Sequence, residues 1–264
     1  MAENKLGMEK SVLYSIGKGI YDGIGKELQN KKAELKLYTT NCLPSLKWDL
    51  INKNIKKYLE NMGFTVQCVK KKRGIWGFLL VADKKDNRLC TIMREERLFE
   101  LIKKPWKHKY HYASALSNFF NYKLKPKNEQ KKLIVMPKSK DEIFKLNKIS
   151  IDICSDIQIN QDTTLYVIIT YTARNYILTS LKAYILTKDL QISDTIDLSE
   201  YMPKDFEAVI TEDDTPTKQG DITLKFRQPA IDKINKHKKE KEIELNLKTD
   251  KEKEENQKDN NNDK

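Results

Sequence analysis

Hydrophobic residues recur at spacings of three and four along residues 9–35, which predicts an amphipathic helix. Four glycines fall inside this stretch, and each destabilises a helix by about 1 kcal/mol relative to alanine. They stand at positions 17, 19, 23 and 25. We therefore expect either close packing against a neighbouring element or a broken, mobile helix. A helix that lies on a membrane surface is the alternative function for this stretch.

Residues 45–64, SLKWDLINKNIKKYLENMGF, repeat the helical spacing and end at Gly63, as a helix commonly does. Short runs of β-branched and aromatic residues follow and predict strands. These runs cover residues 64–69, 75–83 and 88–94, and the turn KKDN joins the last two. The pattern predicts one helix followed by three strands.

The next segments predict two helices and a further strand. EERLFELIKK, residues 95–104, begins with acids, ends with lysines and is stopped by Pro105; the second helix lies around 109–122, and LIVMP at 133–137 is a strand. The remainder is rich in β-formers and predicts an antiparallel sheet. Its strands are expected at 149–159, 164–173, 177–187 and 221–227, with ARNY as a hairpin turn and DTIDLSEYM as a short connection.

Residues 231–264 hold 10 Lys and Arg and 10 Asp and Glu, and no Phe, Tyr or Trp. Such a segment cannot bury enough apolar area to offset its ordering entropy, so we expect a disordered tail. The fold class is α+β, with α/β as the alternative. We expect a basic half at 8–148, an acidic β-rich half at 149–228 packed on it, and the tail.

Charge divides unevenly along the chain, whose formal net charge is +12. Residues 1–148 hold 33 Lys and Arg against 15 Asp and Glu, whereas residues 149–230 hold 7 against 13. A half this basic attracts phosphate polyanions. Lysine outnumbers arginine 44 to 6, which a codon bias can produce, so arginine is the more informative residue.

Four of the six arginines lie within 25 residues, around the two strands at 75–94. The arginine fork suits phosphates and base edges, and neighbouring lysines and tryptophans suit phosphate neutralisation and base stacking. The predicted nucleic-acid-binding residues are Lys71, Lys72, Arg73, Arg94, Arg97, Lys103, Lys104, Trp106 and Lys107. Trp76 lies inside a strand and is expected in the core.

The order helix, three strands, helix, strand resembles the core of restriction-endonuclease-like nucleases. That superfamily places an acid on its second strand and an acid-x-lysine on its third, where two carboxylates hold Mg²⁺. Asp83 and Glu95 are the matching candidate catalytic acids, and Arg97 stands in the lysine position. The alternative for both acids is a structural role at a turn and at a helix start.

The sequence lacks the motifs that are typical of several other functions. No run is apolar enough for a membrane span, the N-terminus lacks a secretory core, and the four cysteines form no CxxC pair. His108 and His111 are three apart but have no third ligand at a convincing spacing. We expect a cytoplasmic protein with no cofactor, except Mg²⁺ if the nuclease alternative holds.

Several segments, taken in order, resemble an uncharacterised family of domain-of-unknown-function proteins from low-GC Gram-positive bacteria and their mobile elements. They are PSLKWDLINKNIKKYL, KKRGIWGFLLVAD, LCTIMREERLFEL, TLYVIITYTARNYILTSLKAYI and DTIDLSEYM. The resemblance covers most of residues 10–202 and brings no established activity. It implies family-characteristic positions at Arg73, Gly74, Trp76, Met93, Arg94, Glu95 and Arg97.

Three functions follow from these patterns. The first is binding of nucleic acid, DNA before RNA, by a degenerate nuclease-like core. The second is a Mg²⁺-dependent endonuclease that uses Asp83 and Glu95. The third is a non-catalytic interaction module whose basic half docks on its own acidic half or on an acidic protein partner.

Overall fold

A single six-stranded sheet organises the fold, which is of the mixed α+β class. The computed structural model describes residues 6–36, 38–60, 62–63, 66–73, 76–127, 138–157 and 159–203. The strands are β1 (Val66–Arg73), β2 (Trp76–Asp83), β3 (Arg88–Arg94), β4 (Leu165–Arg174), β5 (Ile177–Leu186) and β6 (Ile192–Asp197). They lie side by side in sequence order, and only the pair β3 and β4 is parallel.

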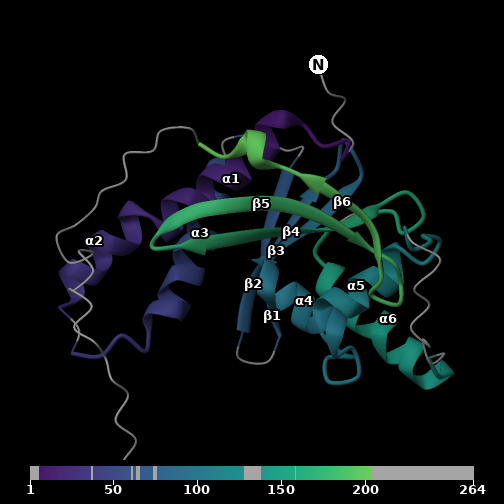
Figure 1. The fold of residues 1–264 in the computed structure, drawn as a ribbon. Helices are drawn as coiled ribbons and strands as arrows, with labels where there is room; N and C mark the ends of the chain where they lie inside the picture. Colours follow the sequence, from purple (N-terminus) through teal and green to yellow (C-terminus); the bar gives the residue numbers. More distant parts are fainter. Residues whose placement is uncertain are drawn as a thin grey trace, which may run out of the picture. The chain divides into compact units, whose positions relative to one another are not determined.

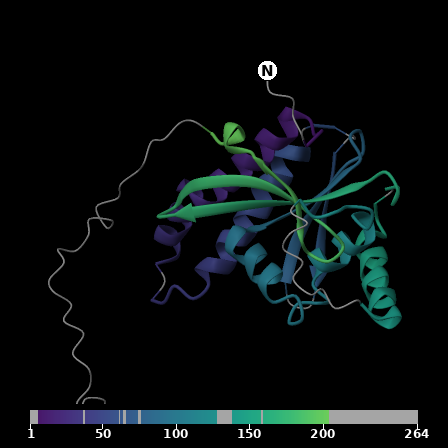
Figure 2. The ribbon, with the colours of Figure 1, turned by 45° about the vertical axis from the view of Figure 1, so that its right-hand side comes forward.

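Helices cover both faces of this sheet (Figure 1). They are α1 (Lys10–Ile24), α2 (Lys26–Leu35), α3 (Leu43–Glu60), α4 (Glu95–Lys103), α5 (Tyr112–Phe120) and α6 (Lys140–Cys154), with a final 3-10 turn at Ser199–Tyr201. Helices α1 and α3 bury one apolar cluster against the sheet, and α4, α5 and α6 bury a second on the opposite face. Figure 2 shows the two helical layers from a second angle.

The parallel pair explains the position of the second helical layer. A chain that leaves β3 must return to the far end of the sheet before β4 can run parallel to it. Helices α4, α5 and α6 lie in this crossover connection. All other neighbouring strands are antiparallel, and the predicted turns KKDN and ARNY do join β2 to β3 and β4 to β5.

The glycines of α1 allow it to approach α3 unusually closely. A Cβ atom on Gly19 would lie 2.6 Å from the backbone nitrogen of Ile55, and one on Gly23 would lie 2.6 Å from that of Ile51. Close packing was one expected outcome and a helix break was the other, and both occur. The helical stretch is interrupted at Gly25, where α1 ends and α2 begins.

The strand expected at 149–159 is wrong, because these residues continue α6 up to Cys154. Leu146, Ile149 and Ile153 recur at helical spacing and face the second apolar cluster, while Ser139 caps the helix by accepting a hydrogen bond from the Glu142 amide. The connection expected at 194–202 is partly strand, since β6 extends to Asp197. The strands expected at 133–137 and 221–227, and the tail, lie outside the described residues.

The basic and acidic halves share the sheet. Strands β1–β3 come from the first and β4–β6 from the second, and the boundary expected between residues 148 and 149 falls inside α6. Ion pairs join the two halves. They include Lys71–Asp156, Lys127–Asp194, Lys138–Asp189 and Lys182–Glu95. Part of the positive charge is therefore neutralised within the fold.

Candidate functional site

A cleft with a volume of about 900 Å³ opens where β3 ends and α4 begins. Its walls come from α2, the first turns of α3, the start of β2, the start of α5 and the tip of the β4–β5 hairpin. Lys47, Arg94 and Arg97 line it, and none of its described lining residues is an aspartate or a glutamate. Because only one sign of charge faces the cleft, it favours an anionic ligand.

Aromatic rings form much of the cleft wall. They belong to Trp48, Phe78, Tyr112, Tyr171 and Tyr176. The rings of Phe78 and Tyr112 stack with centroids 4.1 Å apart and planes within 10° of parallel. The indole Nε1 of Trp48 donates a hydrogen bond of 2.7 Å to the Gly77 carbonyl, so this ring is held in place. Phe78 and Tyr171 are buried, whereas Trp48, Tyr112 and Tyr176 are half-buried and leave aromatic surface near the cations. Such a surface suits a planar, charged ligand.

His111 adds a neutral ring to the cleft. Its Nδ1 accepts a hydrogen bond from the Ala113 amide and so caps α5. Burial lowers the pKa of His111 to about 3, with smaller contributions from Arg97 and His108. The imidazole is therefore uncharged at neutral pH. Its Nδ1 lone pair is already used, which weakens the candidate metal pair with His108.

Four further predicted contact residues lie at the end of α4 and in the connection to α5. Lys103 ends α4, and Lys104, Trp106 and Lys107 lie in the connection to α5. All four are exposed, and Trp106 keeps 68% of its surface in solvent. This connection joins the element that supplies Arg97 to the one that supplies His111. It therefore carries exposed cations on the stretch of chain between two cleft-lining residues, Arg97 and His111.

The remaining predicted contacts lie on β1 and differ in availability. Lys71 forms a 2.8 Å ion pair with Asp156, and only 10% of its side chain is exposed. Lys71 therefore stabilises the fold and is not available to contact a ligand. Lys72 is exposed and pairs in register with Gly77, which lines the cleft. Arg73 ends β1, and its side chain lies outside the described residues.

The structure does not bring Asp83 and Glu95 together. Asp83 ends β2 opposite Arg88, the first residue of β3, whereas Glu95 follows the last residue of β3. The length of β3, about 20 Å at roughly 3.4 Å per residue, separates them. The two carboxylates cannot hold one Mg²⁺ ion. Because β2 and β3 are antiparallel, the end of β2 lies beside the start of β3 and far from the end of β3.

Asp83 instead stabilises the turn between β2 and β3. Its Oδ1 accepts hydrogen bonds from the amides of Lys85 and Asp86, and burial raises the pKa of its carboxyl group.

Across the described ranges, no three His, Cys, Asp or Glu side chains are grouped as they would be in a metal site. Within that same part of the chain, no helix is both long and apolar enough to traverse a bilayer.

Comparison with known proteins places the chain in a family. The family model that matches it, over residues 5–262, is described as a family of unknown function, DUF5986. The chain belongs to DUF5986. No curated protein and no solved structure matches it. The uncharacterised family expected from the sequence is thus confirmed, and the chemistry of this DUF5986 chain has to be inferred from its own residues.

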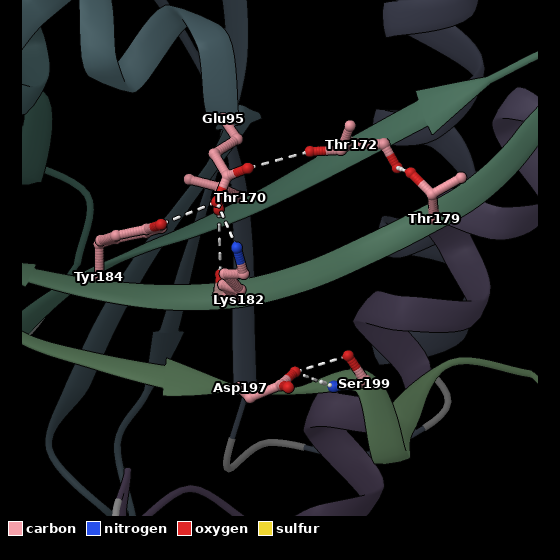
Figure 3. A network of polar contacts seen from close by, with 8 residues as sticks. All are labelled: Glu95, Thr170, Thr172, Thr179, Lys182, Tyr184, Asp197 and Ser199. Atoms are coloured by element: carbon pink, nitrogen blue, oxygen red, sulfur yellow. Dashed lines mark hydrogen bonds and ion pairs between the residues drawn. The ribbon is translucent and has the colours of Figure 1, made fainter.

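Glu95 lies at the centre of a polar network on the sheet face that carries α4 (Figure 3). One carboxylate oxygen accepts from Lys182 Nζ at 3.0 Å and from the Tyr184 hydroxyl at 2.7 Å. The other accepts from the Thr172 hydroxyl at 3.1 Å. Burial raises the pKa of Glu95, but hydrogen bonds from Tyr184, Lys182 and Thr172 outweigh it and lower the pKa overall. This carboxylate ties α4 to β4 and β5.

The partners of Glu95 were not predicted from the sequence. The same holds for four aromatic residues of the cleft, Trp48, Tyr112, Tyr171 and Tyr176. These residues come from α3, α5, β4 and the β4–β5 turn, which are far apart along the chain. The aromatic residues of helices and strands fit the apolar patterns that predict a core. Only the pairing of strands and the packing of α3 show that they face one cleft.

Replacing Glu95 by glutamine is expected to destabilise the fold by about 2 kcal/mol at pH 7, because hydrogen bonds to a charged group contribute about that much. The folded-state pKa lies below the ordinary 4.5, so this contribution is complete above pH 4.5 and is lost as the pH falls through the folded-state value. Urea unfolding from pH 7 to pH 3 measures it. Glu96, whose side chain is 81% exposed, provides the control in Glu96→Gln. Equal stabilities of the two variants at pH 7 would contradict the assignment.

Proposed function

We propose that this protein is a cytoplasmic, DNA-binding protein and that the aromatic, cationic cleft at the end of β3 is its binding site. The observation that carries the proposal is the composition of the cleft. Lys47, Arg94 and Arg97 line it, no carboxylate does so among its described residues, and five aromatic residues line it with them. Nucleic acids present the matching chemistry, since phosphates accept from arginine and lysine and bases stack on aromatic rings.

The exposed basic residues that follow α4 support the same proposal. Lys103, Lys104 and Lys107 place positive charge at the end of α4 and along the connection to α5, and Trp106 is an exposed aromatic residue among them. These cations would contact the sugar-phosphate backbone without reading its sequence. The ion pairs that join the two halves involve none of the cations that line the cleft.

The strand order supports a degenerate nuclease-like core as part of the proposal. Helix α3 precedes β1, β2 and β3, and the crossover through α4 leads to β4 parallel to β3. This is the order noted in the restriction-endonuclease-like superfamily, and the likeness is one of architecture alone. The cleft-lining residues of β2 and β3 are Gly77, Phe78, Met93 and Arg94. None is an acid, so we propose binding without metal-dependent cleavage.

A salt titration of DNA affinity tests the proposal. Binding of a fluorescent DNA oligonucleotide should weaken as salt rises, with a slope of about −2 to −3 in log affinity against log salt if three cations contact phosphates. The same samples with Mg²⁺ should show no shortened products. The absence of binding at 50 mM salt would contradict the proposal, as would an affinity that does not change with salt.

A further inference from the structure

Tyr176 has a backbone conformation that a large side chain rarely adopts. Tyr176 follows Asn175 in the tight turn between β4 and β5. The φ angle is 46° at Asn175 and 62° at Tyr176. Two-residue hairpin turns with both central φ angles positive strongly favour Asn-Gly, because glycine has no Cβ to clash with the backbone. A tyrosine at the second position is strained. Nothing in the turn itself requires an aromatic ring.

Tyr176 lines the cleft with Asn175, on the wall that the β4–β5 hairpin contributes. Its carbonyl oxygen lies 3.6 Å from the position that a Cβ on Gly25 would take, so the hairpin tip sits against the junction of α1 and α2. Backbone strain of this kind persists where the side chain has a function that offsets its cost. Here Tyr176 is one of the aromatic residues that line the cleft together with Arg94 and Arg97.

We propose that the cleft binds an unpaired base of a single-stranded nucleic acid, with Tyr176 as the stacking residue and Arg94 and Arg97 as contacts for the adjoining phosphates. This inference rests on the proposed function and specifies its ligand. An aromatic wall can stack only on a base whose face is free, and in a duplex both faces are covered by neighbouring base pairs. A cleft of about 900 Å³ has room for a nucleotide and part of its neighbour.

The variants Tyr176→Gly and Tyr176→Phe separate stacking from folding. Glycine relieves the strain and should leave the Tm at or about 2 °C above that of the wild type. It removes the ring, so affinity for a labelled single-stranded 12-mer should fall about tenfold, the loss of one base-aromatic stack. Affinity for the blunt duplex of the same sequence should stay within twofold. Phenylalanine keeps both the ring and the strain, so Tyr176→Phe should bind the single strand as the wild type does.

Each outcome of this experiment bears on the proposal. If Tyr176→Gly binds the single strand as tightly as the wild type, Tyr176 is not the stacking residue and the inference is overturned. A Tm well below that of the wild type would remove the strain argument and overturn it too. If the wild type binds a mononucleotide as tightly as the 12-mer, the cleft is a site for a free nucleotide, and the strand assignment is wrong. Binding of neither single strand nor duplex would reject the proposed function itself, which the other outcomes leave standing.

Discussion

The double variant Arg94→Ala, Arg97→Ala is expected to bind DNA about 100-fold more weakly than the wild type in 0.1 M salt. Both arginines line the cleft. A hydrogen bond to a charged group contributes about 1.5 kcal/mol, which is roughly tenfold in affinity for each arginine. The salt slope should also become shallower by about two, since two phosphate contacts are lost. Fluorescence anisotropy with a labelled oligonucleotide measures both quantities.

The fold of this variant should be almost unchanged, because the ion pairs that the two arginines form with described residues lie on the surface. Arg94 lies 3.9 Å from Glu96, and Arg97 pairs with Glu100 on the same helix. Such pairs contribute about 0 to 1 kcal/mol. The matched control is Lys145→Ala, Lys148→Ala, which removes two exposed charges from α6. If this control weakens binding as much as the arginine variant does, the effect reflects net charge and the cleft is not the site.

The double variant Gly19→Ala, Gly23→Ala should destabilise the fold by about 2 kcal/mol in net, because the steric overlap at two positions outweighs the gain in helix propensity. Each new methyl group would lie 2.6 Å from a backbone nitrogen of α3, where no side-chain rotation relieves the clash, so the helices must separate. Overpacking of this kind costs about 1 to 3 kcal/mol at each position. Intrinsic helix propensity acts in the opposite direction, by about 1 kcal/mol for each glycine replaced. Urea unfolding gives the net result.

The control for this prediction is Lys18→Ala. Lys18 lies in the same helix, and 39% of its side chain is exposed. It removes one surface ion pair with Asp22 and should change stability by less than about 0.5 kcal/mol. A double glycine variant more stable than the wild type would show that helix propensity dominates. It would contradict the close packing of α1 on α3.

The helices and the first hairpins could be predicted from sequence where periodicity and turn chemistry agree. The stripe of α3 is regular and ends near a glycine, and KKDN separates two strongly apolar strands. The segment 149–159 was predicted wrongly because its isoleucines fit two periods at once. Ile149, Ile151 and Ile153 alternate as in a strand, yet Ile149 and Ile153 also share a helix face with Leu146. Packing against the sheet decides between these periods.

The candidate site was predictable only in part. Arg94 and Arg97 were found because arginine is rare in this chain, and both line the cleft. The pairing of Asp83 with Glu95 was wrong because the motif gives an order along the chain, whereas the antiparallel register sets the distance between strand ends. Tyr176 left one signal in the sequence, a tyrosine where a tight turn favours glycine. Its place in the cleft depends on the packing of the hairpin.

Photo-cross-linking tests most directly whether the cleft holds nucleic acid. A single-stranded 12-mer that carries one photoreactive base is bound to the full chain and irradiated, and the cross-linked peptides are mapped by mass spectrometry. We expect cross-links in the peptides that contain Trp48, Tyr112 or Tyr176, and we expect excess unlabelled strand to abolish them. Cross-links confined to other surfaces, such as α6, with none in the cleft peptides, would contradict the assignment of this cleft as the binding site.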